Sequence, residues 1–362
     1  MLAASDTALL LRQLPKAELH LHLEGMLLPE RVTSLAQKYS VPLDAEELRS
    51  RYDLRGFSQF LQLYKWATSF LREPEDYAQL AEDTVIALNQ QNVVYAEITL
   101  SVGVMFLRRQ NVAANFAAIR QAFLQNAAAG AGPRVQFIFD AVRQFGAAPA
   151  LEVARSAAEL CQEGVVAFGL GGEELSVPLG DFRDAFLHAH HHGLHLVCHA
   201  GETGGPDQIK DAIDLLGAER IGHGIAAIRS SALMNTLAER KIPLEICPTS
   251  NVCTSALNIQ LNSAHCKLAD HPLPRLFRHG IPITLSTDDP AMFHTTLLEE
   301  YSAALAMGLS LDELRIIARS SFEHAFLPEP ARQSFLARLA QSSDSQVSIP
   351  SARSAGGASD HE

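Results

Sequence analysis

Short apolar runs of strand character alternate with helical segments along most of this 362-residue chain. Eight such runs can be recognised, with stretches of helical apolar spacing between them. They cover residues 17–23, 93–100, 135–141, 164–170, 195–199, 220–223, 243–248 and 282–287. This alternation predicts an α/β fold whose parallel sheet closes as a (β/α)8 TIM barrel. An open, doubly wound sheet is the alternative, but no G-x-G-x-x-G motif follows the first run.

Helical additions to this barrel are expected after the first strand and after the last. Residues 43–73 form an insertion with a stripe of large side chains at roughly helical spacing: Phe57, Phe60, Leu61, Tyr64 and Phe70. Such a stripe is usually core, which we favour, although its position also allows a lid over a pocket. Helices at 296–307 and 310–340 would complete a single domain over residues 1–340. Residues 341–362 are rich in Ser, Ala and Gly and are predicted to be a disordered tail.

Charge and composition exclude several classes of partner. The formal net charge is −12 and no Lys/Arg cluster is present, so a nucleic acid is not expected to bind. No apolar run is long enough to span a membrane, and the N-terminus lacks the features of a signal peptide. None of the five cysteines forms C-x-x-C, which favours reduced thiols and a cytoplasmic protein. We therefore expect a small-molecule partner; a monomer and a homo-oligomer are both compatible with the sequence.

The first strand carries two histidines on one face. At strand period, His20, His22 and Glu24 point one way, whereas the intervening leucines point the other way. Two imidazoles two residues apart can hold one metal ion, and the leucines need an apolar neighbour such as a layer of helices. A structural histidine pair is the alternative interpretation of this stretch.

Polar side chains also stand at the ends of later strands. His199 ends the fifth strand and Glu202 follows it, His223 ends the sixth, and Asp288 and Asp289 follow the eighth. Strand ends converge at one mouth of a barrel, so these side chains are expected to meet the first strand's histidines. Imidazole and carboxylate ligands suit Zn²⁺, although iron or manganese could use the same atoms. The predicted ligands are His20, His22, His199 and Asp288.

These residue types are suited to hydrolysis. Water held by such a metal loses a proton near neutral pH, and His223 could take that proton or orient the water. Glu202 could pass a proton to a reacting nitrogen if its apolar surroundings raise its pKa. Asp289 could exchange a hydrogen bond with the substrate. The histidine-rich stretch at 188–195 is interpreted as the end of a helix, not as a second metal site.

Five sequence blocks carry a family resemblance: LPKAELHLHLEG, VCHAGET, RIGHG, ICPTSN and TLSTDDPAMF. In this order they resemble the adenosine deaminase family of the amidohydrolase superfamily, over roughly residues 14–330. The resemblance implies zinc-dependent hydrolytic deamination at C6 of an adenine ring, with release of ammonia. It makes Glu202 the proton donor to ring N1 and His223 the residue that activates water. It also implies that Asp289 contacts N7 and Gly172 contacts N3, with His20, His22, His199 and Asp288 as zinc ligands.

The substrate is the least constrained part of the prediction. Members similar to this chain act on adenosine, on free adenine or on 5′-modified adenosines such as aminodeoxyfutalosine, used in menaquinone synthesis. Adenosine-specific members usually carry an aspartate that meets the ribose 5′-hydroxyl; this chain has Glu24 at that substrate-binding position, as free-adenine members often do. In contrast, Ser286-Thr287-Asp288 is closer to the nucleoside type. We predict deamination of adenosine and deoxyadenosine, with aminodeoxyfutalosine and adenine as alternatives. Another amidohydrolase activity and a non-catalytic purine-binding protein are more remote alternatives. A cytidine-type deaminase is excluded because no P-C-x-x-C motif is present.

Overall fold

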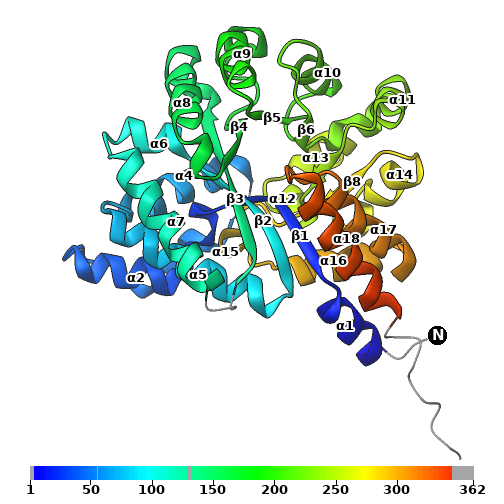
Figure 1. The fold of residues 1–362 in the computed structure, drawn as a ribbon, viewed down its shortest axis with the longest axis horizontal. Helices are drawn as coiled ribbons and strands as arrows, with labels where there is room; N and C mark the ends of the chain where they lie inside the picture. Colours follow the sequence, from blue (N-terminus) through cyan, green and yellow to red (C-terminus); the bar gives the residue numbers. More distant parts are fainter. Residues whose placement is uncertain (1–3, 55, 129–131, 345–362) are drawn as a thin grey trace, which may run out of the picture.

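The computed structural model describes residues 4–54, 56–128 and 132–344. Its eight strands are parallel and pair in chain order, from β1 to β8, so the predicted (β/α)8 barrel is confirmed (Figure 1). The strands are β1 (Lys16–His22), β2 (Val93–Leu100), β3 (Arg134–Val142), β4 (Val165–Gly171), β5 (His195–Ala200), β6 (Arg220–His223), β7 (Leu244–Ile246) and β8 (Ile283–Leu285).

The barrel closes between its first strand and the residues that follow its last. Leu21 forms an isolated parallel bridge with Asp288. The Asp288 N–H donates to the carbonyl of His20 at 3.0 Å, and the His22 N–H donates to the carbonyl of Asp288 at 2.9 Å. The seam therefore brings three of the predicted ligands together through backbone hydrogen bonds.

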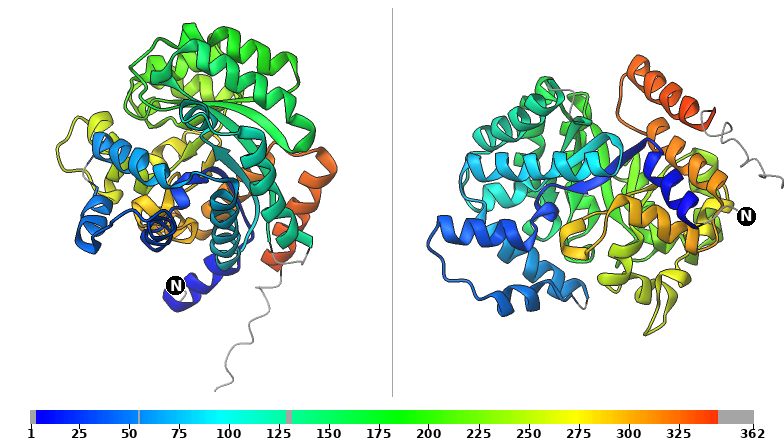
Figure 2. Two further views of the ribbon diagram at one scale, coloured as in Figure 1. Left: turned by 90° about the vertical axis from the view of Figure 1, so that its left-hand side faces the viewer. Right: turned by 90° about the horizontal axis from the view of Figure 1, so that it is seen from below.

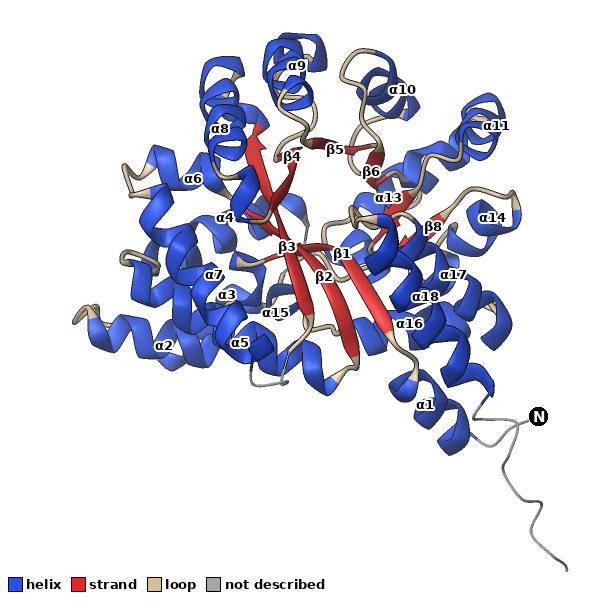
Figure 3. Ribbon diagram, in the orientation of Figure 1, coloured by secondary structure: helices blue, strands red, loops and turns tan. Residues whose placement is uncertain are grey.

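Helices surround the strands on the outside, as Figures 2 and 3 show. The main ones are α5 (Pro74–Gln90), α7 (Val112–Ala128), α8 (Ala147–Glu159), α9 (Arg183–His191), α10 (Pro206–Asp214), α11 (Ser231–Arg240), α14 (Leu273–Arg278) and α17 (Leu311–Glu323). Short helices α6 (Val102–Leu107), α12 (Pro248–Cys253) and α15 (Pro290–Phe293) follow β2, β7 and β8, and α13 (Ala256–Leu261) follows α12.

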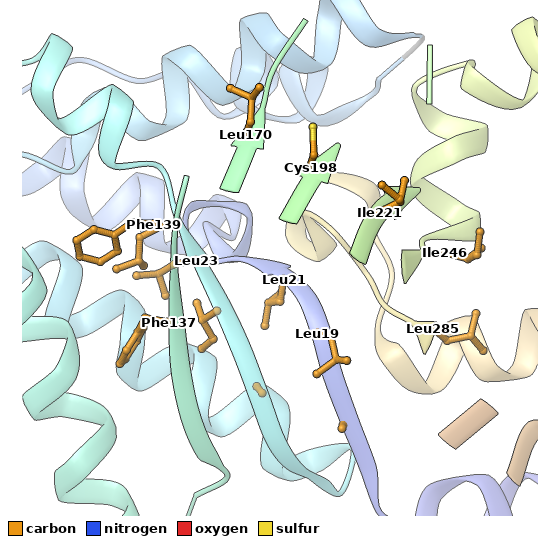
Figure 4. Close-up of a cluster of buried hydrophobic side chains, with 14 of the residues drawn as sticks. Leu19, Leu21, Leu23, Phe137, Phe139, Leu170, Cys198, Ile221, Ile246 and Leu285 are labelled. Atoms are coloured by element: carbon orange, nitrogen blue, oxygen red, sulfur yellow. The ribbon is translucent and has the colours of Figure 1, made fainter. Parts of the chain in front are cut away.

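The outward faces of the strands form the apolar core beneath these helices. Leu19, Leu21 and Leu23 are fully buried there, together with Phe139 and Ile221 of other strands (Figure 4). Burial of each such side chain contributes about 1.5–3 kcal/mol. The predicted apolar neighbour of the three leucines is thus confirmed.

The additions differ in part from the prediction. Residues 310–340 form two helices, α17 and α18 (Glu329–Asp344), because Pro328 and Pro330 interrupt the helical hydrogen bonding. Helix α18 includes residues 341–344 of the predicted tail, and residues 345–362 lie outside the described residues. Further helices are α1 (Ala4–Gln13), α2 (Pro29–Lys38), α3 (Ala45–Tyr52), α4 (Phe57–Ala67) and α16 (Leu297–Ala306).

The aromatic stripe of the insertion belongs to the core, as favoured, and most of it also lines a cavity. Phe60 and Phe70 belong to the buried core, and Phe57, Leu61 and Tyr64 pack against it. All of these except Phe70 also line a cavity at the barrel mouth. The core interpretation is therefore incomplete, because helix α4 also forms a wall of that cavity.

Two further observations concern the cysteines and the length of the helices. The five cysteines, all within the described residues, form no disulfide, as expected for reduced thiols. Among the described residues, no helix combines the length and apolar character needed to cross a bilayer.

Candidate active site

A cavity of about 760 Å³ lies at the carboxyl ends of the strands. The predicted site residues that line it are His22, Gly172, His199, Glu202, His223, Asp288 and Asp289. Two others, His20 and Glu24, are buried but are not among its lining residues. The structure therefore brings seven of the nine predicted residues to one cavity wall.

The four predicted ligands form one cluster. One nitrogen or oxygen atom from each of them lies within 4.8 Å of those of the others. Nε2 of His22 is 3.3 Å from Nε2 of His199, and Oδ1 of Asp288 is 3.4 Å from Nε2 of both His20 and His22. Two atoms that each lie about 2.0–2.2 Å from one zinc ion are about 3–4 Å apart, as these pairs are. The buried Nε2 of His20 has no hydrogen-bond partner, so this donor set fits a metal ion.

Asp288 and His223 adopt backbone conformations that are uncommon for residues with side chains. Their φ angles are +69° and +60°, in the left-handed region. Such conformations persist where the surrounding structure enforces them, and they cluster at functional sites. The barrel seam fixes the backbone of Asp288, and the Ser250 hydroxyl donates to its Oδ2 at 2.7 Å.

A buried carboxylate that the sequence analysis missed supports His20. Oε2 of Glu245 lies 2.7 Å from Nδ1 of His20, and Nε of Arg220 donates to its Oε1 at 2.6 Å. Burial alone would raise the pKa of Glu245, but Arg220 and His20 outweigh it and hold that pKa below its usual value. Glu245 is therefore a carboxylate that accepts the Nδ1 proton of His20 and directs Nε2 toward the cluster. A charged residue inside an apolar strand run was the available signal.

Glu202 is held in a buried loop by another residue that was missed. The Glu174 carboxylate accepts the N–H groups of Gly201, Glu202, Thr203 and Gly204 at 2.6–3.1 Å. The Thr254 hydroxyl donates to Oε1 of Glu202 at 3.1 Å. Burial, and secondarily the negative charge of Asp288, raises the pKa of Glu202 well above its usual value. This direction is the one that the predicted acid role of Glu202 needs.

His223 faces two carboxyl groups. Its Nε2 lies 3.7 Å from Oε2 of Glu202 and 3.9 Å from Oδ2 of Asp288. Its Nδ1 lies 3.1 Å from Nδ2 of Asn251. Burial lowers the pKa of His223 to about 3, so the ring is neutral at physiological pH.

Asp289 and Gly172 both line the cavity. Oδ1 of Asp289 is buried without a hydrogen-bond partner, and burial followed by the Asp288 charge raises the pKa of Asp289 well above its usual value. Asp289 can therefore donate a proton in a hydrogen bond. Gly172 has φ +95°, and a Cβ atom there would collide with the side chain of Gln144. Only glycine fits this conformation without strain.

Glu24 was predicted to share the strand face of His20 and His22, but it lies outside the first strand. Strand β1 ends at His22, and Glu24 begins the 3₁₀ helix η1 (Glu24–Met26). The Ser101 N–H donates to its Oε1 at 3.1 Å, and the Tyr64 hydroxyl lies 3.4 Å from its Oε2. Ser101 and Tyr64 line the cavity, so Glu24 supports two residues of the cavity wall.

A (β/α)8 barrel that gathers three histidines and one aspartate at its mouth defines a metal-dependent hydrolase of the amidohydrolase type. Residues 15–342 match the family model described as adenosine deaminase. The chain belongs to this family, as its sequence motifs predicted. It is a hydrolase of cyclic amidine C–N bonds, a deaminase of the purine or adenine type.

Relatives and solved structures agree with this assignment. The chain is 38% identical over 338 residues to "Aminodeoxyfutalosine deaminase" of Streptomyces coelicolor, covering 91% of this chain and 84% of the relative. It is 35% identical to "Adenine deaminase" of Cupriavidus metallidurans, covering 91% of each chain. The crystal structure of adenine deaminase from Arthrobacter aurescens superposes with a TM-score of 0.84 at 28% identity, covering 91% of this chain and 99% of that one.

The comparisons favour the alternatives over adenosine itself. Adenosine and deoxyadenosine were the substrates predicted from the sequence, whereas these relatives are named for aminodeoxyfutalosine or adenine.

The histidine-rich stretch at 188–195 spans the end of α9 and the start of β5. Within the described residues, the cluster at the barrel mouth is the only group with metal-ligand spacing.

Proposed function

We propose that this protein hydrolyses the C6 amino group of an adenine-ring substrate with one Zn²⁺ held by His20, His22, His199 and Asp288. The observation that carries the proposal is the cluster of these four side chains at the cavity, three of which line it together with Glu202 and His223. When bound, the zinc ion would supply the Lewis acidity that lets water act as a nucleophile near neutral pH.

The remaining residues would prepare the ring for attack. Glu202, protonated because its pKa is raised, donates its proton to N1 and makes C6 more electrophilic. Asp289 donates a hydrogen bond to N7, and the Gly172 N–H donates one to N3. His223 orients the attacking water or takes its proton. The oxygen of water bonds to C6, the C6–N6 bond breaks, and ammonia leaves, so one water is consumed for each ammonia released.

For the substrate, we propose a 5′-modified adenosine of the aminodeoxyfutalosine type. The cavity of about 760 Å³ is in the range of sites that enclose drug-sized ligands, and a bare purine would fill little of it. Phe57, Leu61 and Tyr64 of α4 line it together with Lys65 and Arg108, which suits a substituent larger than free ribose. Free adenine is the second candidate, because a relative with that name is almost as similar.

A substrate panel tests this proposal. The zinc-loaded protein would be assayed with adenosine, deoxyadenosine, adenine, methylthioadenosine and aminodeoxyfutalosine, and kcat/KM compared. We expect the largest kcat/KM for aminodeoxyfutalosine. A higher value for adenine would overturn the substrate assignment but keep the reaction. Turnover of amides and of no 6-aminopurine would overturn the reaction as well.

A further inference from the structure

A chain of three hydrogen bonds ends on the ring of His223. The Leu273 N–H, at the start of α14, lies 3.1 Å from Nδ1 of His271. Nε2 of His271 lies 3.2 Å from Oδ1 of Asn251, and Nδ2 of Asn251 lies 3.1 Å from Nδ1 of His223. The three side chains are each at most 4% exposed, so water does not compete for these contacts.

The Leu273 N–H determines which atom donates in each of these three hydrogen bonds. A backbone N–H can only donate, so Nδ1 of His271 accepts and the proton of its neutral ring sits on Nε2. That proton is donated to the Asn251 carbonyl oxygen, which leaves the amide NH₂ group facing His223. Nδ1 of His223 therefore accepts, and its neutral ring carries hydrogen on Nε2. Moving that hydrogen to Nδ1 would place two donors against each other in a dry interior.

The state of His271 agrees with this direction. Burial lowers the pKa of His271 to about 3, so its ring is neutral at physiological pH and has one acceptor nitrogen for the Leu273 N–H. At the other end, Nε2 of His223 faces oxygen atoms of Glu202 and Asp288 at 3.7 and 3.9 Å. Burial is outweighed at Asp288 by hydrogen bonding to His20 and by the neighbouring histidines, which hold the pKa of this carboxylate below its usual range. A nitrogen that carries hydrogen is therefore its favourable partner.

We propose that Asn251 and His271 are positioning residues that keep hydrogen on Nε2 of His223, so that His223 donates a hydrogen bond to the attacking oxygen and does not take its proton. This inference rests on the proposed function, in which both roles of His223 were open. The role of His223 is thus determined by two side chains outside the set predicted from the sequence. Asn251 lies on α12, and His271 lies in the loop before α14.

The substitution Asn251→Asp reverses the polarity at almost constant shape. A carboxylate can still accept from Nε2 of His271, but it can only accept from His223, so the neutral ring must carry hydrogen on Nδ1 and lose it from Nε2. A donor role predicts that kcat falls at least about tenfold at a pH where the ring is neutral, since loss of one active-site donor costs about 10²–10³. A base role predicts the opposite, because the variant exposes a lone pair on Nε2. Unchanged or increased kcat would overturn the proposal.

A second His–Asn pair in the chain provides the matched control. Nε2 of the exposed His279 lies 2.8 Å from Oδ1 of Asn235 on α11, outside the cavity. Asn235→Asp introduces the same change of charge and should leave kcat within about twofold of the unmodified protein. A decrease equal to that of Asn251→Asp would show that added charge alone is responsible and would overturn the proposal.

The hydrogen position can also be read without activity. In zinc-loaded protein with ¹⁵N-labelled histidine, two-bond ¹H–¹⁵N correlations distinguish the two neutral forms of an imidazole. We expect His223 and His271 both to carry hydrogen on Nε2 in the unmodified protein. A His223 ring with hydrogen on Nδ1 would overturn the proposal even if Asn251→Asp does not fold. Failure of the proposed function, seen as no turnover of any 6-aminopurine, would leave this spectrum unaffected.

Discussion

Oε2 of Glu245 lies 2.7 Å from Nδ1 of His20 inside the barrel, directly behind the proposed ligand cluster. The hydrogen bond commits Nδ1, so Nε2 is the nitrogen available to a metal. Residues that orient a metal-binding histidine in this way typically change metal affinity by about 10–100-fold when replaced. The contact gives Glu245 a function that is separate from substrate binding.

Glu245→Gln should therefore weaken zinc binding by about 10–100-fold, as measured by competition with a chromophoric chelator. An amide can donate as well as accept, so it no longer fixes the hydrogen on Nδ1 of His20. Glu219→Gln is the matched control, because Glu219 contacts Nδ1 of His195 at 2.8 Å on the exposed side of the barrel. Equal zinc affinities for both variants and the unmodified protein would contradict the account.

Glu202→Gln should lower kcat by about 10²–10⁴-fold and leave KM nearly unchanged. The glutamine side chain fills the same space and can keep the Thr254 hydroxyl as a partner, but it has no acidic proton to transfer to N1. Steady-state kinetics with the substrate preferred in the panel measures both constants. A variant that turns over at the normal rate would remove Glu202 from the reaction.

The pH profile should show that Glu202 acts as an acid. Its pKa is raised by burial and by Asp288, so the protonated, active form persists well above the usual pH range of a glutamate. As pH rises through that raised pKa, the proton is lost and kcat/KM should fall. The decrease should be absent from the residual activity of Glu202→Gln. An unmodified enzyme whose kcat/KM only rises across the neutral and alkaline range would contradict the assignment.

Removal of the Glu174 carboxylate should affect both stability and rate. Four backbone N–H groups of residues 201–204 lose their acceptor in Glu174→Ala, and unpaired buried donors cost about 1–3 kcal/mol each unless water enters. We expect the free energy of unfolding to fall by about 2–3 kcal/mol in urea titrations, with a lower kcat because the loop carries Glu202. Glu173→Ala, at the exposed neighbouring residue, should leave stability within about 0.5 kcal/mol of the unmodified protein. Equal stability of the two variants would show that the four contacts contribute little.

Residues that repeat with strand or helix period could be predicted from the sequence. His20 and His22 share the inner face of β1, and the alternation of runs required a barrel that brings His199 and Asp288 beside them. The element boundaries were less predictable. Strand β1 ends before Glu24, because η1 begins there, although the alternation of side chains continues through Leu23.

The supporting side chains could not be predicted because their partners are distant in sequence. Glu245 is 225 residues from His20, and Glu174 is 27 to 30 residues from the N–H groups that it accepts. Asn251 lies within the ICPTSN block, but its function depends on His271 and on the backbone of Leu273. A local pattern can mark Glu245 as a charged residue inside an apolar run, but it does not identify the partners of these side chains, which meet only once the barrel has closed.

The central claim is metal-dependent release of ammonia from a 6-aminopurine, and ammonia release is its most direct measurement. The purified protein would be stripped of metal with a chelator, reloaded with one equivalent of Zn²⁺, and assayed for ammonia and for the purine product with aminodeoxyfutalosine or adenine. We predict negligible release without metal, restored turnover with zinc, and one ammonia for each purine converted. Equal activity of the metal-free protein, or no ammonia from any 6-aminopurine after reloading, would contradict the account.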